Sequence, residues 1–90
     1  MINVLAKLKV ESYDRWKPLF DKRADVREES GSRGTHLFLN SDNSNEVLIL
    51  FKWDNKENAH KYMDSDNLRQ NLKKVGAEII DITYLDEQEI

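Results

Sequence analysis

Cysteine is absent from this 90-residue sequence. Its absence excludes disulfides, thiolate catalysis, zinc–thiolate sites and iron–sulfur clusters. A chain of this length buries too little surface for a wide stability margin, so oligomerisation is the remaining way to strengthen the fold. Glycine and proline are also scarce: Pro18 is the only proline, and the three glycines, each where an element is expected to end, are Gly31, Gly34 and Gly76.

Long apolar runs are missing as well. The longest, residues 47–51, is far shorter than the roughly 20 residues of a membrane-spanning helix. The first residues, Met1-Ile2-Asn3-Val4, lack the basic and apolar regions of a signal peptide. We therefore expect a cytoplasmic protein with no membrane contact.

Hydrophobic periodicity predicts six elements. Period-two alternation indicates strands, and apolar residues three and four apart indicate helices. The predicted strands are residues 2–10, 34–40, 46–53 and 78–85, and the predicted helices are residues 13–30 and 55–75. The order βαββαβ with right-handed crossovers predicts an α+β, ferredoxin-like fold. We expect one domain, residues 1–90, with a four-stranded antiparallel sheet and two helices on one face.

Local signals predict where the two helices begin and break. Ser12 or Asp14 caps the start of the first helix, and Pro18 implies an irregular start or a kink there. Asp54, with a glutamate three residues later, resembles a capping box before the second helix. Ser65, followed by an aspartate, is a second cap signal, so we expect the second helix to break at this point.

Nucleic acid is a poor candidate partner. The 14 lysines and arginines against 17 aspartates and glutamates give a net charge of −3, and an acidic domain does not attract polyanions. RNA-recognition modules share the βαββαβ order, but they need a basic sheet face and a strand with aromatics and glycines. The predicted strand over residues 46–53 is apolar and lacks glycine.

That same strand points to a partner of another kind. It is apolar on both faces except for Lys52, and such a strand is expected to be covered on both sides. Two helices cover only one face, so Leu48 and Leu50, or their neighbours of opposite parity, would be exposed. The sheet of a second copy is the simplest cover, and we therefore expect a homodimer.

Four aromatic residues are the leading candidates for a ligand site. Trp16 and Phe20 lie on the apolar stripe of the first helix, Tyr62 lies on that of the second, and Trp53 ends the third strand. Between helices and sheet they either fill a solid core or form the wall of a pocket for a flat aromatic ligand. Whether Trp53 or its neighbour Lys52 faces the helices depends on the strand register.

The two histidines offer less specific signals. His36 lies in an otherwise apolar strand, and it or its neighbour Leu37 faces the helices. His36 would be a general base, the role that histidine side chains commonly take near neutral pH, or else a strand residue without a chemical role. His60 and Asp64 have the i, i+4 spacing of metal ligands, but no third ligand is close in sequence, so we predict no metal site.

Several motifs together resemble one family over roughly residues 2–85. They are Tyr13-Asp14-x-Trp16-x-x-x-Phe20, Arg27-x-x-x-Gly31, Asp42-x-x-Asn45-Glu46-Val47, Phe51-x-Trp53 and Ala59-x-x-Tyr62-x-x-Ser65-Asp66-x-Leu68-Arg69-x-x-Leu72-x-x-x-Gly76. On these residues the chain resembles the antibiotic biosynthesis monooxygenase-like group of the dimeric α+β barrel superfamily.

The resemblance implies a homodimer whose two sheets pack into a barrel, with a cleft between sheet and helices in each subunit. Characterised relatives oxidise aromatic polyketides or quinols with O₂ and need no metal or flavin. The electron-rich substrate is the reductant, and the protein supplies deprotonation and a dry pocket. The resemblance thus implies a cofactor-independent monooxygenase acting on a small aromatic or quinoid molecule, with no cofactor.

In that function His36 would take a phenolic proton and Tyr62 would hydrogen-bond the ligand oxygen. Trp16, Phe20 and Trp53 would complete the ligand-binding wall. The alternative is a noncatalytic dimeric module that binds a small ligand or has a stress-associated role. The sequence leaves open whether the protein is an enzyme.

Another branch of the superfamily degrades haem with an asparagine on the first strand and a tryptophan and a histidine on the second helix. Here the tryptophan position holds Tyr62, the histidine position holds Leu72, and Asn3 is out of the expected register. Without the histidine ligand, the resemblance does not extend to haem degradation.

Overall fold

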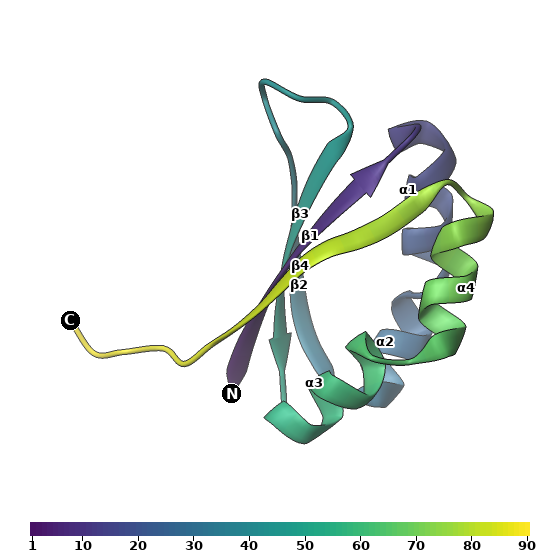
Figure 1. The fold of residues 1–90 in the computed structure, drawn as a ribbon. Coiled ribbons are helices and arrows are strands. Elements are labelled where there is room, and N and C mark those ends of the chain that lie inside the picture. Colours follow the sequence, from purple (N-terminus) through teal and green to yellow (C-terminus); the bar gives the residue numbers. More distant parts are fainter.

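The computed structural model describes residues 1–90 and contains four strands and four helices (Figure 1). The strands are β1 (Ile2–Val10), β2 (Ser32–Leu39), β3 (Glu46–Trp53) and β4 (Ala77–Leu85), and the helices are α1 (Tyr13–Lys22), α2 (Ala24–Ser30), α3 (Lys56–Met63) and α4 (Asp66–Lys74). The sheet order is β2-β3-β1-β4, and every pair is antiparallel. All four helices lie on one face of the sheet (Figure 1). The predicted ferredoxin-like α+β fold is confirmed.

Strand bounds agree with the prediction for β1 and β3 and differ slightly for the edge strands. β2 begins at Ser32, which pairs with Trp53 across a register shift that precedes Gly34. An extra residue in such a bulge interrupts the alternation, so periodicity alone does not show that the strand continues across it. β4 begins at Ala77 and carries a similar shift opposite Lys7 and Leu8 of β1.

Each of the two predicted helices is in fact a pair of helices. Ser65 starts α4 by accepting a hydrogen bond from the Leu68 N–H at 3.1 Å, which confirms the break predicted there. The first helix breaks at Arg23 and not at Pro18, through which α1 continues. Arg23 has φ −88° and ψ 7° and caps α2 with no side-chain hydrogen bond, so no cap residue marks this break in the sequence.

Two further caps fix where helices begin. Ser12 accepts a hydrogen bond from the Arg15 N–H at 3.3 Å and starts α1. The predicted capping box at Asp54 is wrong, because Asn55 caps α3 by accepting from the Asn58 N–H at 2.8 Å. A one-residue shift is enough to free the Asp54 carboxylate for other contacts.

The sheet has two faces of different character. The helix-covered face buries every alternate residue of β1 and β3 to 0–7% exposure: Ile2, Val4, Ala6, Leu8, Val10, Val47, Ile49, Phe51 and Trp53. The opposite side, called the bare face below, has no helix over it (Figure 1). Its central side chains come from β1, β2 and β3, and are Leu5, His36, Phe38, Leu48 and Leu50. Both leucines singled out on the third strand therefore lie on the bare face.

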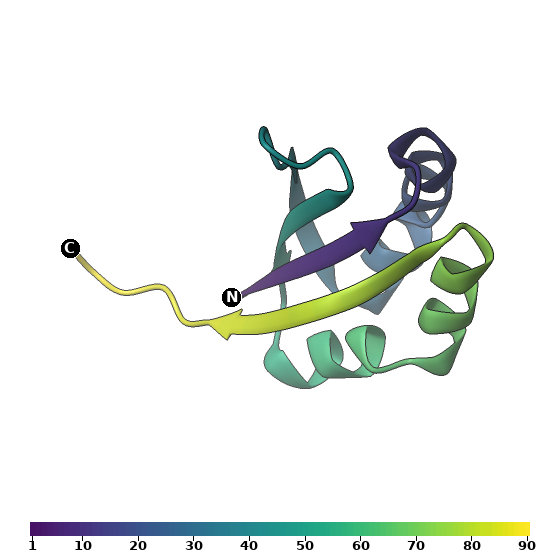
Figure 2. The same cartoon turned by 45° about the horizontal axis from the view of Figure 1, so that its top comes forward.

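The C-terminal residues 86–90 continue beyond β4 and extend away from both layers (Figure 2). All of them are exposed. None of the four helices combines the length and apolar character that crossing a membrane requires.

Candidate functional site

A cavity of about 40 Å³ lies between the helices and the sheet and is called the helix–sheet cavity below. Arg23 and Arg27 are the only charged residues among the 14 that line it, and none of these is a histidine or a carboxylate. That volume holds about three water molecules and no aromatic ring. A flat ligand therefore enters only if part of the wall moves.

Three of the four predicted aromatic residues line this cavity. Trp16 and Phe20 of α1 have ring centroids 5.1 Å apart, and Tyr62 enters from α3. Trp53, and not its neighbour Lys52, faces the helices. It lies behind Tyr62, and the centroids of the two rings are 5.2 Å apart. Its indole N–H donates to the Ser30 carbonyl oxygen at 3.0 Å. Trp53 thus supports the wall and is not part of it.

Arg27 brings a buried positive charge to the cavity. Its side chain lies on α2 and is only 7% exposed. The guanidinium Nη1 donates to the Phe20 carbonyl oxygen at 2.6 Å, and Cζ lies 4.0 Å from the centroid of the Phe20 ring. None of the ion pairs in the structure includes Arg27. Burial lowers the pKa of Arg27, and the nearby Tyr62 opposes this shift.

Arg23 and Tyr62 are hydrogen-bonded to each other in the lining of the cavity. Arg23 Nε donates to the Tyr62 hydroxyl at 3.2 Å, and Arg23 Nη1 donates to Asn67 Oδ1 at 3.3 Å. The same two residues also line a surface groove of about 340 Å³ between α2, α3 and α4, called the outer groove below. Because Arg23 and Tyr62 belong to both linings, the hydrogen bond between them lies where the groove meets the cavity.

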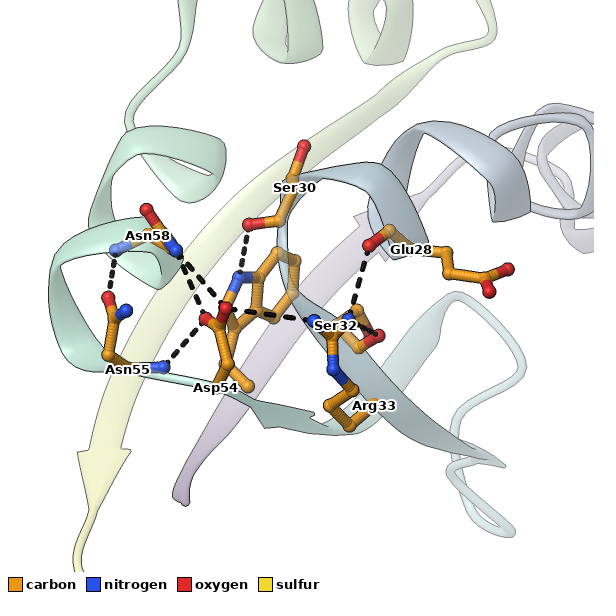
Figure 3. A network of polar contacts seen from close by, with 8 residues as sticks. Glu28, Ser30, Ser32, Arg33, Asp54, Asn55 and Asn58 are labelled. Atoms are coloured by element: carbon orange, nitrogen blue, oxygen red, sulfur yellow. Dashed lines mark hydrogen bonds and ion pairs between the residues drawn. The ribbon is translucent and has the colours of Figure 1, made fainter.

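A polar network around Asp54 holds the start of α3 in place (Figure 3). Asp54 Oδ1 accepts from the next backbone N–H at 2.7 Å and from Asn58 Nδ2 at 3.2 Å, and Oδ2 lies 3.8 Å from Arg33 Nη2. Gly31 ends α2 with φ +116°, and a Cβ there would collide with the Asp54 carboxylate. The network thereby ties the ends of α2 and β3 to the helix that carries Tyr62.

His36 lies on the bare face and not at the cavity. The register pairs it with Leu50, and its side chain is exposed. Of the two neighbours left open by the sequence, Leu37 is the one that packs against the helix-covered core. His36 and Tyr62 are on opposite sides of the sheet, so the predicted role of His36 as a base in the helix–sheet cavity does not fit the geometry.

The three positions compared with the haem-degrading branch do not form a common site. Tyr62 and Leu72 line the cavity, whereas Asn3 lies on the bare face. His60 Nδ1 lies 3.5 Å from Asp64 Oδ2. No group of three or more His, Cys, Asp or Glu side chains is arranged to hold a metal ion.

The sequence analysis gives neither Arg23 nor Arg27 a role in the site, although Arg27 belongs to one of the family motifs. A signal for Arg27 exists, because helical spacing places this charged residue on the same apolar stripe as Trp16 and Phe20. A charged side chain on a core-facing stripe is unusual and points to a partner or a ligand. Arg23 offers no such signal, since its position over Tyr62 depends on the unmarked helix break.

Comparison with known proteins identifies relatives of the same fold. The sequence model of the antibiotic biosynthesis monooxygenase family matches residues 1–74. SnoaB, a cofactor-independent oxygenase from Streptomyces nogalater, superposes with a TM-score of 0.76 at 9% identity, covering 99% of this chain and 94% of that one. No curated protein matches the sequence.

Two further solved structures agree. An antibiotic biosynthesis monooxygenase has a TM-score of 0.64 at 12% identity, with 100% of this chain and 99% of that chain covered. A conserved protein from Methanosarcina mazei has a TM-score of 0.62 at 17% identity, with 97% and 92% covered. At these identities the structural likeness shows the fold alone, and the match to the family rests on the sequence.

Proposed function

This chain belongs to the antibiotic biosynthesis monooxygenase family, and on that premise we propose that it is a cofactor-independent monooxygenase for a small aromatic or quinoid molecule. The helix–sheet cavity is the observation that carries the proposal. Trp16 and Phe20 from α1 and Tyr62 from α3 line the cavity, and the Tyr62 hydroxyl accepts a hydrogen bond from the lining residue Arg23. An apolar site with a few placed polar groups is typical of small-molecule pockets. SnoaB, which has a similar fold, is a cofactor-independent oxygenase.

The proposed reaction balances without a cofactor. A phenol gives up its hydroxyl hydrogen and the hydrogen on its para carbon. One atom of O₂ becomes the new carbonyl oxygen of the quinone, and the other leaves as water with the two hydrogens. Because the substrate supplies every electron, the protein has to hold the ring, favour its ionised form and exclude water. Tyr62 is the residue that would hydrogen-bond the substrate oxygen.

Oxygen uptake on a panel of phenols and 1-naphthols that carry a hydrogen on the para carbon, supplied with ¹⁸O₂, tests this function. We expect one labelled oxygen in each product molecule. Tyr62→Phe removes a hydrogen bond to the reacting oxygen, and we expect the rate to fall about tenfold. Tyr13→Phe is the matched control, because Tyr13 packs against Trp16 but does not line the cavity.

His36→Ala distinguishes the two faces of the sheet. We expect this variant to oxidise the panel at the wild-type rate, since His36 has no access to the helix–sheet cavity. Loss of activity in His36→Ala with full activity in Tyr62→Phe would contradict the proposed site and place the chemistry on the bare face.

A noncatalytic binding module is the second candidate function. The observation that favours it is the lining of the cavity, which offers no histidine or carboxylate to accept a proton. In that case a naphthol binds in the cavity and quenches the fluorescence of Trp16, but no labelled product forms from any member of the panel.

We further propose that the protein is a homodimer joined through the bare face. Leu5, Leu48 and Leu50 are neighbours there, and Phe38 beside them is 55% exposed. An isologous contact covers this apolar face on both copies at once. Light scattering at micromolar concentration should give about twice the chain mass of 10.6 kDa. A mass of one chain would contradict the dimer.

A further inference from the structure

Arg27 differs from the other arginines of the chain in having a buried charge without a carboxylate. Arg33 is exposed and pairs with Asp54, and Arg15 is exposed and donates to the Lys74 carbonyl oxygen. Buried charges in proteins are normally paired, because leaving water is costly for an ion. At Arg27 the chain supplies a carbonyl oxygen, a ring face and the nearby Tyr62, and the carboxylate that acts on its charge, Asp21, forms no ion pair with it.

The contacts of Arg27 leave part of its guanidinium available. The guanidinium presents a planar fork of N–H donors that suits an oxyanion, and one of its nitrogens is engaged by the Phe20 carbonyl oxygen. The residue lines the helix–sheet cavity on one side and an open surface depression between α2 and β2 on the other. Arg23 adds a second positive charge to the same lining. An anion in the cavity would therefore meet two arginines and no carboxylate.

We propose that the ligand of the helix–sheet cavity binds as an aromatic oxyanion, a phenolate or an enolate, and that Arg27 is the residue that recognises its charge. This inference rests on the proposed function for the location of the site and for the ionised form of the substrate, and adds the residue that binds the charged oxygen. It also supplies what the cavity lacks. No base lines the cavity, but a guanidinium lowers the pKa of a phenol beside it, so the proton passes to water before or during binding.

In this proposal the ligand enters the cavity between Arg23 and Tyr62, which are hydrogen-bonded to each other in the structure. The cavity alone is too small for a ring, but the outer groove adjoins it and shares these two residues. Moving the Arg23 side chain joins the two spaces. Arg23 lies at the unmarked break between α1 and α2 and is only partly buried, so this side chain can move without disrupting a helix.

Binding of 4-nitrophenol tests the inference directly, because its absorbance distinguishes phenol from phenolate. We expect the bound probe to ionise about one pH unit below the free probe, which is a tenfold preference for the anion. Its methyl ether, 4-nitroanisole, has a similar shape and cannot ionise, and we expect it to bind about tenfold more weakly than the phenolate. Equal binding of the two probes, or failure of both to bind, would overturn the inference.

Variants of Arg27 test whether its charge causes the preference for the phenolate. Arg27→Gln should abolish the preference for the phenolate, and Arg27→Lys should restore part of it because the charge returns without the planar fork. Arg15→Met, at an exposed arginine away from the cavity, should leave the preference unchanged. Circular dichroism checks that each variant is folded. Retention of the full preference in folded Arg27→Gln would contradict the assignment.

The two proposals can fail separately. Labelled product from naphthols with an unchanged rate in Arg27→Gln would keep the monooxygenase function and remove the oxyanion inference. Phenolate-selective binding that depends on Arg27, without any labelled product, would keep the oxyanion site and leave the noncatalytic module.

Discussion

The helix-covered face and the bare face belong to the same four strands, yet their side chains have different chemistry. On β1 and β3 the covered face consists of aliphatic and aromatic residues that are almost completely buried. The bare face alternates leucines with lysines: Leu5 and Lys7 on β1 lie opposite Leu50 and Leu48 on β3. Leucines are not expected on a face that is covered only by water, and lysines are not expected on a face that is completely buried.

The comparison teaches that one alternating sequence can serve two contacts. The covered face forms the core and the cavity with Arg27, which are complete within one chain. The bare face is suited to a partner that buries its centre and leaves lysine side chains at the edge in water, as in the polar rim of an interface. Lys7 already has a partner within the chain, since its Nζ lies 3.8 Å from Glu46 Oε1.

Phenylalanine occurs on both faces and gives the largest contrast. Phe51 is 3% exposed on the covered face of β3, whereas Phe38 on β2 lies on the bare face. We expect Phe51→Ala to lower the free energy of unfolding by about 3–5 kcal/mol, because it leaves a cavity in the core. Phe38→Ala should cost less than about 1 kcal/mol in dilute protein. Urea unfolding at two protein concentrations measures both.

Protein concentration separates the two substitutions further. If the bare face joins two copies, the cost of Phe38→Ala grows with concentration and that of Phe51→Ala does not. If both substitutions lower the free energy of unfolding equally, and by an amount that does not depend on protein concentration, the bare face is not an interface between two copies.

Leu50→Asp tests the bare face without touching the core. A carboxylate buried in an apolar interface is costly, and we expect the dimer dissociation constant to rise at least about a hundredfold, or about 2.7 kcal/mol. Analytical ultracentrifugation over a concentration series measures the change. Gln70→Asp, at an exposed position on α4, is the control and should leave the mass unchanged. An intact Leu50→Asp dimer would move the interface elsewhere.

Two glycines sharpen the description of the covered side, where α2 meets β3. Gly31→Ala should cost about 2 kcal/mol, because φ +116° is unfavourable for alanine and its Cβ would collide with Asp54. Gly34→Ala is the matched control. A Cβ at Gly34 would approach only the Lys52 side chain, at 4.0 Å, so a loss below about 0.5 kcal/mol is expected. Thermal unfolding of both variants gives the comparison, and similar losses would argue against the role of the Asp54 network.

Periodicity was sufficient to predict the two faces of β1, but not those of β2 and β3. Alternation alone placed Val4 and Leu8 on one face of β1, because a strand buried on one face repeats every two residues, and both are buried in the structure. The order of elements then limited the topology, since right-handed crossovers leave few arrangements. The break at Ser65 was predictable for a similar local reason, as the side chain that caps α4 is visible in the sequence.

The candidate site was harder to predict because it depends on residues without local signals. The position of Arg23 follows from a helix break that no cap residue marks. His36 and Leu37 are equally compatible with the strand pattern until pairing with Leu50 fixes the register. The sequence therefore predicted that Trp16 lies in the wall of the cavity. It predicted neither that Arg27 lies in the same wall nor on which face of the sheet His36 lies.

Tyr84 is the exception on the covered face and has the smallest expected effect. Its hydroxyl is buried without a hydrogen-bond partner, and its ring stacks on His60 with the centroids 4.0 Å apart. Burial, and then the charge of Asp64, raise the pKa of Tyr84. Tyr84→Phe removes an unsatisfied polar group, so we expect the protein to gain about 1 kcal/mol of stability at neutral pH.

The pH dependence of the Tyr84 variant follows from the same shift. A raised pKa means that the folded state holds this proton more tightly, so its contribution to stability is constant below the unfolded pKa of about 10 and falls as pH rises through the folded pKa. Wild-type protein should lose stability across that alkaline range more steeply than Tyr84→Phe. Urea unfolding at pH values on both sides of 10 measures the two slopes, with Tyr13→Phe, at a partly exposed tyrosine, as the control for neutral-pH stability. Two outcomes would contradict this: parallel slopes in wild type and Tyr84→Phe, or a lower stability of the variant at neutral pH. Either would show that the Tyr84 hydroxyl has a hydrogen-bond partner in solution, so that the covered face has no unpaired polar group.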